Sequence, residues 1–308
     1  MSGAKQPTLR QLNYLRALYQ KLHFKHAADS CSITQAAFST AINNLEQALG
    51  VTLIDRTNKQ VVFTSLGKKI IEQTDVILHE VKQLQDIADS NTTLFSSHLR
   101  LGIIPTIAPF ILPRALPKIS AKWPQMRLSI HEDLTANLNK MLLKGDLDIL
   151  LLALPVTLKG AESLGLFKDH FKLAYKKNTS LFSPPDYRES LLPDGSILLL
   201  KDGHCLRNHA LSACSIENED KVSPYAVSSM HTLIQMVQSD IGITFIPELA
   251  IRANLLKYTA IETMDMPAHA YREIGFAWRK GTRQREKFCQ FAKTLLTITG
   301  INLPPVSA

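Results

Sequence analysis

The sequence lacks any apolar run long enough to cross a membrane. Its longest uninterrupted apolar stretch, residues 149–156, is far shorter than the ~20 residues that a membrane-spanning helix needs. The amino-terminal residues also lack the apolar region of a secretory signal peptide, so we expect a cytoplasmic protein without a membrane partner. In that compartment the four cysteines are expected to be thiols rather than structural disulfides.

Several motifs of common enzyme classes are also missing. The sequence shows no glycine-rich phosphate loop, no Ser/His/Asp arrangement and no Cys/His cluster with the spacing of metal ligands. We therefore expect no cofactor and no metal site. A composition of 45% hydrophobic and 20% charged residues is typical of a globular protein, and 308 residues predict two or three domains.

Most of the net charge of +8 lies near the amino terminus. Residues 1–70 contain nine basic and three acidic side chains, whereas the remaining 238 residues contain 26 basic and 24 acidic ones. Such a local excess attracts a polyanion such as double-stranded DNA. A solvated basic face without a partner is the alternative interpretation.

Within this basic region the sequence predicts a helix-turn-helix. Leucines at helical spacing predict a first helix over residues 8–22, and residues 26–31 suit a short second helix. Ser32 and Thr34 are candidate N-caps of a third helix that ends at Gly50. A hairpin over residues 51–63 would follow as a basic wing that rests on phosphates.

The third predicted helix is apolar on one side and polar on the other. The apolar stripe comprises Phe38, Ile42, Leu45 and Leu49. The polar face comprises Ala36, Ser39, Thr40, Asn43 and Gln47. Because Asn and Gln side chains can pair with adenine edges, this face could enter a major groove. An ordinary amphipathic surface helix is the alternative.

A long helix is predicted from Ser65 to about Ser90. Its apolar positions step by four and three residues, which is the spacing of a coiled-coil seam. The seam residues that we expect to pair two chains are Ile70, Ile77, Val81 and Leu84. Packing of this stripe against the rest of the same chain is the alternative.

Beyond residue 98 strands and helices alternate, which predicts an α/β region with parallel sheets. The expected strands of the first array are residues 99–104, 126–131 and 147–152, with helices near 107–121 and 135–144 between them. A second array has expected strands at 171–175, 197–200, 225–227, 243–246 and 274–278, a helix at 230–239 and a terminal helix at 283–298. Two such Rossmann-like lobes, joined by crossover strands, would enclose a ligand cleft of the kind found in periplasmic binding proteins.

Particular residues now indicate a family. Residues 23–57, HFKHAADSCSITQAAFSTAINNLEQALGVTLIDRT, resemble the winged helix-turn-helix of LysR-type transcriptional regulators, and the linker helix and two lobes resemble that family along the whole chain. The run Asp202-Gly-His-Cys-Leu-Arg207, followed by Cys214, resembles its hydrogen-peroxide-sensing OxyR branch, as do residues 102–106 (GIIPT) and His131-Glu132.

The resemblance implies four regions and a set of DNA contacts. The regions are a DNA-binding domain (1–63), a linker and dimerisation helix (64–90), a regulatory lobe I (97–169 plus 272–308) and a regulatory lobe II with redox cysteines (170–271). The residues expected at DNA are Lys25, Thr34, Gln35, Ser39, Thr40, Asn43, Arg56 and Lys59.

The resemblance also implies a peroxide sensor in which Cys205 is the peroxidatic thiol and Cys214 the resolving one. Thr106, Thr135, His204 and Arg272 are then expected around the peroxide. Only a thiolate attacks peroxide usefully, so Cys205 needs nearby positive charge. The neighbours expected to supply this charge are Lys201, His204, Arg207 and His209.

The leading interpretation is thus a non-enzymatic, redox-switched activator that acts as a homodimer or homotetramer. RNA polymerase and a cellular thiol reductant are the further partners that we expect. A regulator that binds a small metabolite between the lobes, with incidental cysteines, is the main alternative. A thiol peroxidase is a third, although the basic winged module has no role in peroxidase turnover.

Overall fold

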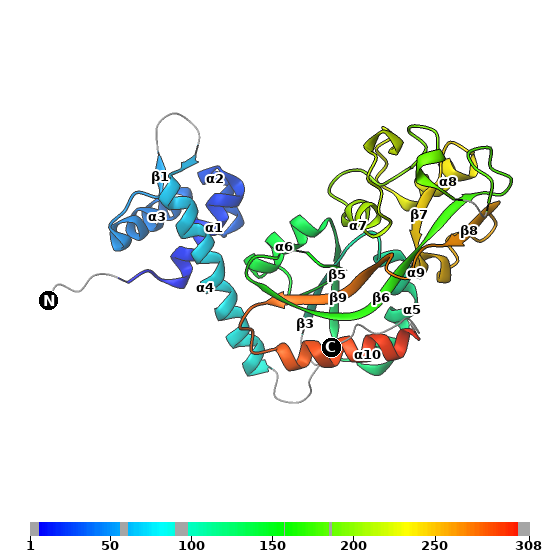
Figure 1. Ribbon diagram of the computed structural model, residues 1–308. Coiled ribbons are helices and arrows are strands. Elements are labelled where there is room, and N and C mark those ends of the chain that lie inside the picture. The colour runs from blue at the N-terminus through cyan, green and yellow to red at the C-terminus, as the bar shows by residue number, and fades with distance from the viewer. Residues whose placement is uncertain (1–5, 56–60, 90–97, 157, 185–186, 301–308) are drawn as a thin grey trace. The chain divides into compact units, whose positions relative to one another are not determined.

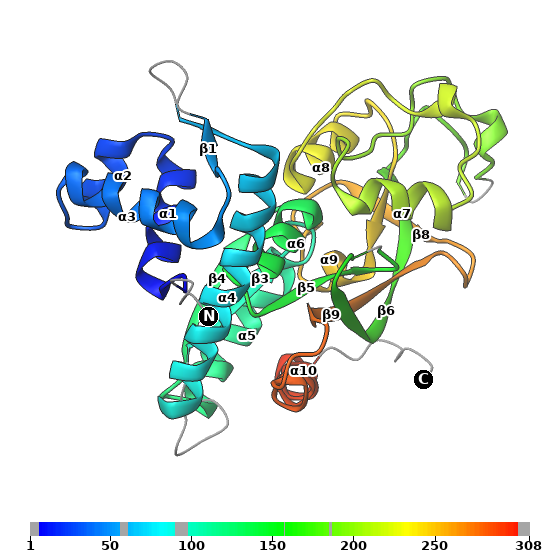
Figure 2. The same cartoon turned by 90° about the vertical axis from the view of Figure 1, so that its left-hand side faces the viewer.

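The computed structural model describes residues 6–55, 61–89, 98–156, 158–184 and 187–300. The chain separates into two compact units, residues 1–92 and residues 93–308 (Figures 1 and 2). Among the described residues no helix is both long and apolar enough to span a bilayer.

The first unit begins with three helices, α1 (Leu9–Lys21), α2 (Phe24–Ser30) and α3 (Gln35–Leu49). The Thr34 side chain caps α3 by accepting a hydrogen bond from the Ala37 amide at 3.3 Å, and Gly50 ends the helix in the left-handed conformation. These elements confirm the predicted helix-turn-helix. The apolar stripe of α3 is also confirmed in its main part, because the unit buries Phe38, Ile42 and Leu45 completely.

A two-stranded hairpin follows, formed by β1 (Ile54–Asp55) and β2 (Val62–Phe63) in antiparallel register. One carboxylate oxygen of Glu46 accepts hydrogen bonds from the amides of Leu53 and Ile54, at 2.7 and 3.2 Å. The last turns of α3 therefore hold the start of the wing. The predicted wing contacts Arg56 and Lys59 lie outside the described residues.

The long helix α4 (Ser65–Asp89) completes the first unit. Among its described side chains the buried ones are Ile71, Thr74 and Leu78, which pack on the unit's own core. The predicted seam lies beside this buried face. Ile77 and Leu84 are 38% and 69% exposed, and Ile70 and Val81 are half-buried. Helix α4 thus has one face that packs on the core of the first unit and a second, apolar face that is partly exposed.

The second unit contains a seven-stranded sheet in the order β4-β3-β5-β9-β6-β7, with β8 also paired to β6. Strand β3 (His98–Ile103) runs parallel to β4 (Arg127–Glu132) and β5 (Ile149–Leu154). The connecting helices are α5 (Ala108–Lys122) and α6 (Thr135–Lys144). This part confirms the predicted βαβ array.

Two long antiparallel strands cross the second unit, β6 (Ala161–Lys176) and β9 (Tyr271–Arg279), and Figure 1 shows them side by side. The first part of β6 pairs with β9, and its last residues pair with β7 (Thr244–Pro247) and β8 (Ile261–Asp265). The α/β two-lobe fold is confirmed, and so is the parallel pairing of the first array, but the prediction that the second array is parallel as well is wrong. The sheet is mixed because these strands run antiparallel to their neighbours.

The remaining helices are α7 (Cys205–Ala213), α8 (Met230–Gln238), α9 (Glu248–Arg252) and α10 (Arg285–Thr299), with two short 3₁₀ helices, η1 (Glu189–Leu191) and η2 (Glu219–Lys221). The predicted strands at 197–200 and 225–227 are wrong, because these segments form only isolated bridges such as Leu200 to Val227. No helix was predicted where α7 lies. It forms because Leu206 and Ala210, four residues apart, are both buried.

Candidate functional site

Three segments that are distant in the sequence meet around one small cavity in the second unit. Thr106 comes from the turn after β3, Thr135 is the first residue of α6, and His204 and Cys205 lie at the start of α7. Gly203 allows this approach, since a Cβ atom there would stand 3.2 Å from Leu134 and its φ of +93° favours glycine. The structure therefore brings together four of the six expected redox residues in one cavity.

Arg272 lies behind this cavity rather than on its surface. The fully buried guanidinium donates from Nη1 to the Thr106 hydroxyl at 2.9 Å and from Nη2 to the Thr106 carbonyl at 3.0 Å. Because the Thr106 oxygen accepts from Arg272, its own hydrogen remains available to a second partner. Arg272 thus orients Thr106. Arg272 was expected to lie beside the peroxide, but it is not among the residues that line the cavity.

Asp169 fixes Arg272 from the other side. Its Oδ2 accepts a hydrogen bond from Arg272 Nε at 3.0 Å, and its Oδ1 accepts one from the Leu249 amide at 2.9 Å. Both members of the ion pair are fully buried. Burial raises the pKa of Asp169, while Arg272 and the Leu249 amide oppose that effect. The sequence did not indicate Asp169, because its partner lies 103 residues away on another strand.

The Cys205 thiol occupies the first position of α7. Burial raises its pKa, and the opposing influences are the Arg272 charge, the Thr135 hydroxyl and the backbone amides of Cys205 and Leu206. Amides at a helix start favour a negative charge. Burial therefore opposes ionisation of the thiol, although the groups around it would stabilise its thiolate.

The neighbours expected to supply positive charge, Lys201, His204, Arg207 and His209, are not among the groups that lower the pKa of Cys205. Arg207 Nε is 2.9 Å from Asp202 Oδ1. Burial lowers the pKa values of His204 and His209, so both rings are neutral near pH 7. The cation that favours the thiolate is Arg272, which strand β9 brings from 67 positions further along the sequence.

Thr135 provides a second hydroxyl. Its buried Oγ1 has no hydrogen-bond partner of normal geometry among the described residues, although it lies close enough to the Cys205 thiol to lower the pKa of that thiol, and Leu134 rather than Thr135 occupies the N-cap position of α6. A buried hydroxyl without a partner is costly, so Thr106 and Thr135 can each offer a hydrogen bond to an added oxygen once the closely packed side chains make room for it.

Cys214 lies at the other end of the same helix, as the C-cap of α7. It is buried, and burial raises its pKa to about 12. At ~1.5 Å rise per residue the Cα atoms of Cys205 and Cys214 are about 14 Å apart. This is beyond the ~7 Å within which a disulfide can form. The two sulfur atoms therefore cannot bond while α7 stays helical, and both cysteines are free thiols.

The predicted DNA residues within the described part of the chain are all at least partly accessible. Lys25, Thr34, Gln35 and Thr40 are exposed, and Ser39 and Asn43 are half-buried on the outer side of α3. The Thr40 hydroxyl donates to the Ala36 carbonyl at 3.0 Å. Their role at DNA stays a prediction, but the α3 residues among them are more accessible than the buried stripe of that helix.

Comparison with known proteins supports the division into these two units. The family model of the bacterial regulatory helix-turn-helix protein, lysR family, matches residues 9–68, and that of the LysR substrate binding domain matches residues 93–298. The HTH-type transcriptional regulator EstR of Acinetobacter baylyi is 34% identical over 294 residues, which cover 95% of this chain and 97% of the relative.

Two further similarities concern peroxide regulators. The DNA-binding transcriptional dual regulator OxyR of Escherichia coli (strain K12) is 32% identical over 287 residues, which cover 93% of this chain and 94% of the relative. The solved structure of a full-length OxyR variant from Pseudomonas aeruginosa aligns with a TM-score of 0.74 at 26% identity and covers 99% of both chains.

Proposed function

Because the chain belongs to the LysR family of transcriptional regulators and is closely related to OxyR peroxide sensors, we propose that hydrogen peroxide switches its DNA binding through Cys205 and Cys214. The family consists of regulators rather than enzymes. The observation that carries the proposal is that two cysteines stand at opposite ends of one short helix, and that one of them shares a cavity with Thr106 and Thr135.

The first chemical step is attack of the Cys205 thiolate on one peroxide oxygen. The S–O bond forms as the O–O bond breaks, which gives a sulfenic acid and a hydroxide that takes a proton to become water. The Thr106 and Thr135 hydroxyls hold the peroxide oxygens. Arg272, held by Asp169, stabilises the negative charge through Thr106.

The second step joins the two cysteines. The Cys214 sulfur attacks the Cys205 sulfur, a disulfide forms, and the sulfenic oxygen leaves as a second water, so that two thiols lose two electrons to one peroxide. Cys214 is a poor nucleophile in the intact helix because burial holds its proton. Unfolding of α7 would expose Cys214 and would allow its sulfur atom to reach the sulfur atom of Cys205.

The switch therefore consists of helix α7 itself. Loss of the helix would remove Leu206 and Ala210 from the core of the second unit. The lobes that we propose, residues 97–169 plus 272–308 and residues 170–271, share strand β6, so this repacking would reach both. A cellular thiol reductant would restore the helix by exchange.

The first unit would bind DNA, and its binding would change in response to peroxide. The outer face of α3 would read bases while Lys25 and the wing residues Arg56 and Lys59 contact phosphates. Pairing through Ile70, Ile77, Val81 and Leu84 would give a homodimer or homotetramer, whose two-fold symmetry suits two half-sites. Activation of transcription would then involve RNA polymerase.

Hydrogen exchange of peptides within residues 206–213 tests the switch. One equivalent of peroxide should abolish protection of these amides in the unmodified protein. The Cys214→Ser variant should retain that protection, because it can form the sulfenic acid but not the disulfide. Unchanged protection in a fully crosslinked sample would refute helix unfolding.

A reporter assay separates this proposal from metabolite sensing. Cys205→Ser should abolish the transcriptional response to peroxide, whereas Cys289→Ser, a half-buried cysteine on α10, should leave it intact. A normal peroxide response in the Cys205→Ser strain would show that the cysteines are incidental.

A further inference from the structure

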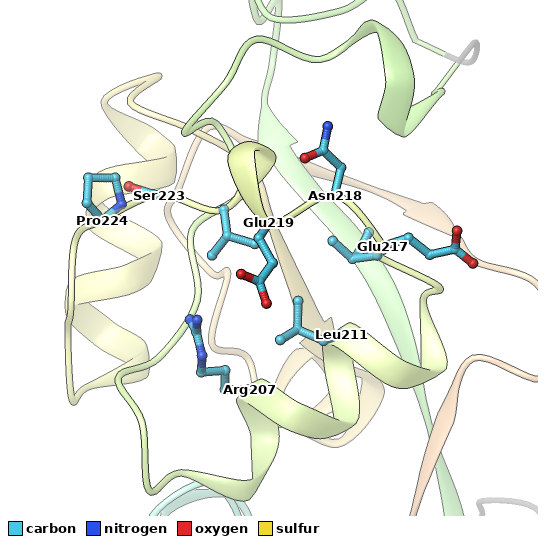
Figure 3. Close-up of a pocket in the computed structure, with 9 residues that line it drawn as sticks. Arg207, Leu211, Glu217, Asn218, Glu219, Ser223 and Pro224 are labelled. Atoms are coloured by element: carbon cyan, nitrogen blue, oxygen red, sulfur yellow. The ribbon is translucent and has the colours of Figure 1, made fainter.

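The outer side of α7 borders a second cavity, separate from the one that contains Cys205. It has a volume of about 370 Å³, within the range of small-molecule sites. One wall is formed by Arg207 and Leu211 of α7, and the opposite wall by the segment from Ile216 to Pro224, which includes η2 (Figure 3).

The side chains that point into this space carry one charge of each sign. Figure 3 shows the Arg207 guanidinium and the Glu219 carboxylate directed toward the same space, beside Leu211. The carboxylate of Glu217 and the amide of Asn218 point away from Arg207 in the same view. Cation and anion are thus placed on opposite walls, with apolar surface between them.

The charged groups of Arg207 and Glu219 can each form a hydrogen bond with a ligand. The Arg207 Nε lies 2.9 Å from Asp202, and the guanidinium has further N–H groups at its end. Asp202 is 92% exposed, so solvent weakens this ion pair. Apolar side chains of Leu211, Ile216, Val222 and Pro224 line the rest of the cavity.

From this arrangement we propose that the cavity is a binding site for a small zwitterion of the amino-acid type. The ligand carboxylate would accept hydrogen bonds from Arg207, and its ammonium group would donate to Glu219. An aliphatic part would cover Leu211. A purely anionic ligand would face the uncompensated Glu219 carboxylate, and a purely cationic one would face Arg207.

The site has a consequence for regulation, which rests on the proposed redox function. Arg207 and Leu211 belong to α7, so the cavity loses one wall if the helix unfolds. A ligand that binds only the helical form stabilises that form by mass action. Zwitterion binding would therefore slow disulfide formation, and oxidation would weaken zwitterion binding by the same coupling.

Binding to the full-length thiol form tests the site without any peroxide. The probes are norleucine, hexanoate, which lacks its ammonium group, and pentylamine, which lacks its carboxylate. Calorimetry or ligand-observed NMR should show norleucine bound at least about tenfold more tightly than either, since each lost contact is a charge-assisted hydrogen bond. Equal binding of hexanoate, or no binding of norleucine, would overturn the proposal.

Matched variants locate the site. Glu219→Gln and Arg207→Gln should each weaken norleucine binding about tenfold. Asp220→Asn removes the same charge from the next, exposed side chain, which does not line the cavity, and should leave the affinity unchanged. Equal losses in Asp220→Asn and Glu219→Gln would indicate a general charge effect and refute the assignment.

The effect of zwitterion binding on disulfide formation is tested in a separate experiment. Saturating norleucine should slow peroxide-driven crosslinking of Cys205 to Cys214 several-fold, and should have no such effect in Glu219→Gln. If norleucine binds as described and no crosslink forms at all, the redox function fails and the zwitterion site stands. If the crosslink forms at an unchanged rate with norleucine bound, the coupling is refuted.

Discussion

Asp169 and Arg272 stand directly opposite each other on β6 and β9, fully buried and joined by a hydrogen bond of 3.0 Å. This pair links the two crossover strands to the thiol site, because the same guanidinium binds Thr106. We therefore regard Asp169 as a positioning residue, which acts on the chemistry through Arg272.

Asp169→Asn should separate two reactions of Cys205. Without the carboxylate the Arg272 charge is uncompensated, so the thiolate is favoured and alkylation by iodoacetamide accelerates. Arg272 also loses its orientation, so the peroxide reaction slows. We expect the ratio of the two rate constants, measured by stopped flow, to fall at least about tenfold. Breaking this buried pair should also cost about 3–5 kcal/mol of stability.

Asp265→Asn is the matched control for that measurement. It removes an ion pair with Lys172 between β6 and β8 that is largely exposed on the aspartate side. Both Cys205 reactions should stay at the unmodified rate. Equal changes of both reactions in Asp169→Asn would mean that Asp169 has only a structural role.

The rate of Cys205 oxidation should rise with pH. Burial places the thiol pKa above its usual value, so the thiolate fraction grows about tenfold per pH unit below that pKa. In Cys214→Ser, which isolates the first step, the second-order rate constant should still be increasing at about pH 8.5. A plateau near neutral pH would show that the thiol is ionised at rest.

The first unit was largely predictable from local signals. Capping by Thr34, termination at Gly50 and the spacing of Phe38, Ile42 and Leu45 all act within one helix, so the sequence carries them directly. The cavity residues Thr106, Thr135, His204 and Cys205 were identified through the family resemblance, and the structure places them together.

The features that the sequence did not predict depend on contacts between residues that are distant in the sequence. Asp169 gains its role only from the register of β6 and β9, and α7 is stabilised by packing that overrides weak local propensities. For the same reason the positive charge near Cys205 could not be assigned from adjacent residues. Arg272 reaches the site through the fold alone.

Lys25→Ala should weaken binding to all DNA sequences alike. The side chain is exposed at the start of α2, and its proposed role is a phosphate contact. Loss of one such contact should reduce the slope of log affinity against log salt by about 0.9, measured by fluorescence anisotropy. Lys118→Ala removes an exposed lysine of the second unit and should leave the slope unchanged. A loss confined to one operator sequence would indicate base reading instead.

Leu84→Asp should reduce self-association. The side chain is 69% exposed on α4, so a charge there does not disturb the core of the first unit. If the seam pairs two chains, a buried aspartate would destabilise the interface strongly. Analytical ultracentrifugation should then show dissociation at concentrations where Val76→Asp, an exposed neighbour off the seam, remains associated. Identical profiles for the two variants would contradict the predicted seam.

We propose that the disulfide between Cys205 and Cys214 changes how the protein binds DNA. The most direct measurement is a peroxide titration in which the Cys205–Cys214 crosslink, determined by mass spectrometry, and the DNA footprint are followed in the same samples. We expect the footprint to change in proportion to the crosslinked fraction and to stay constant in Cys214→Ser. A footprint that shifts while Cys205 and Cys214 remain unlinked would contradict it.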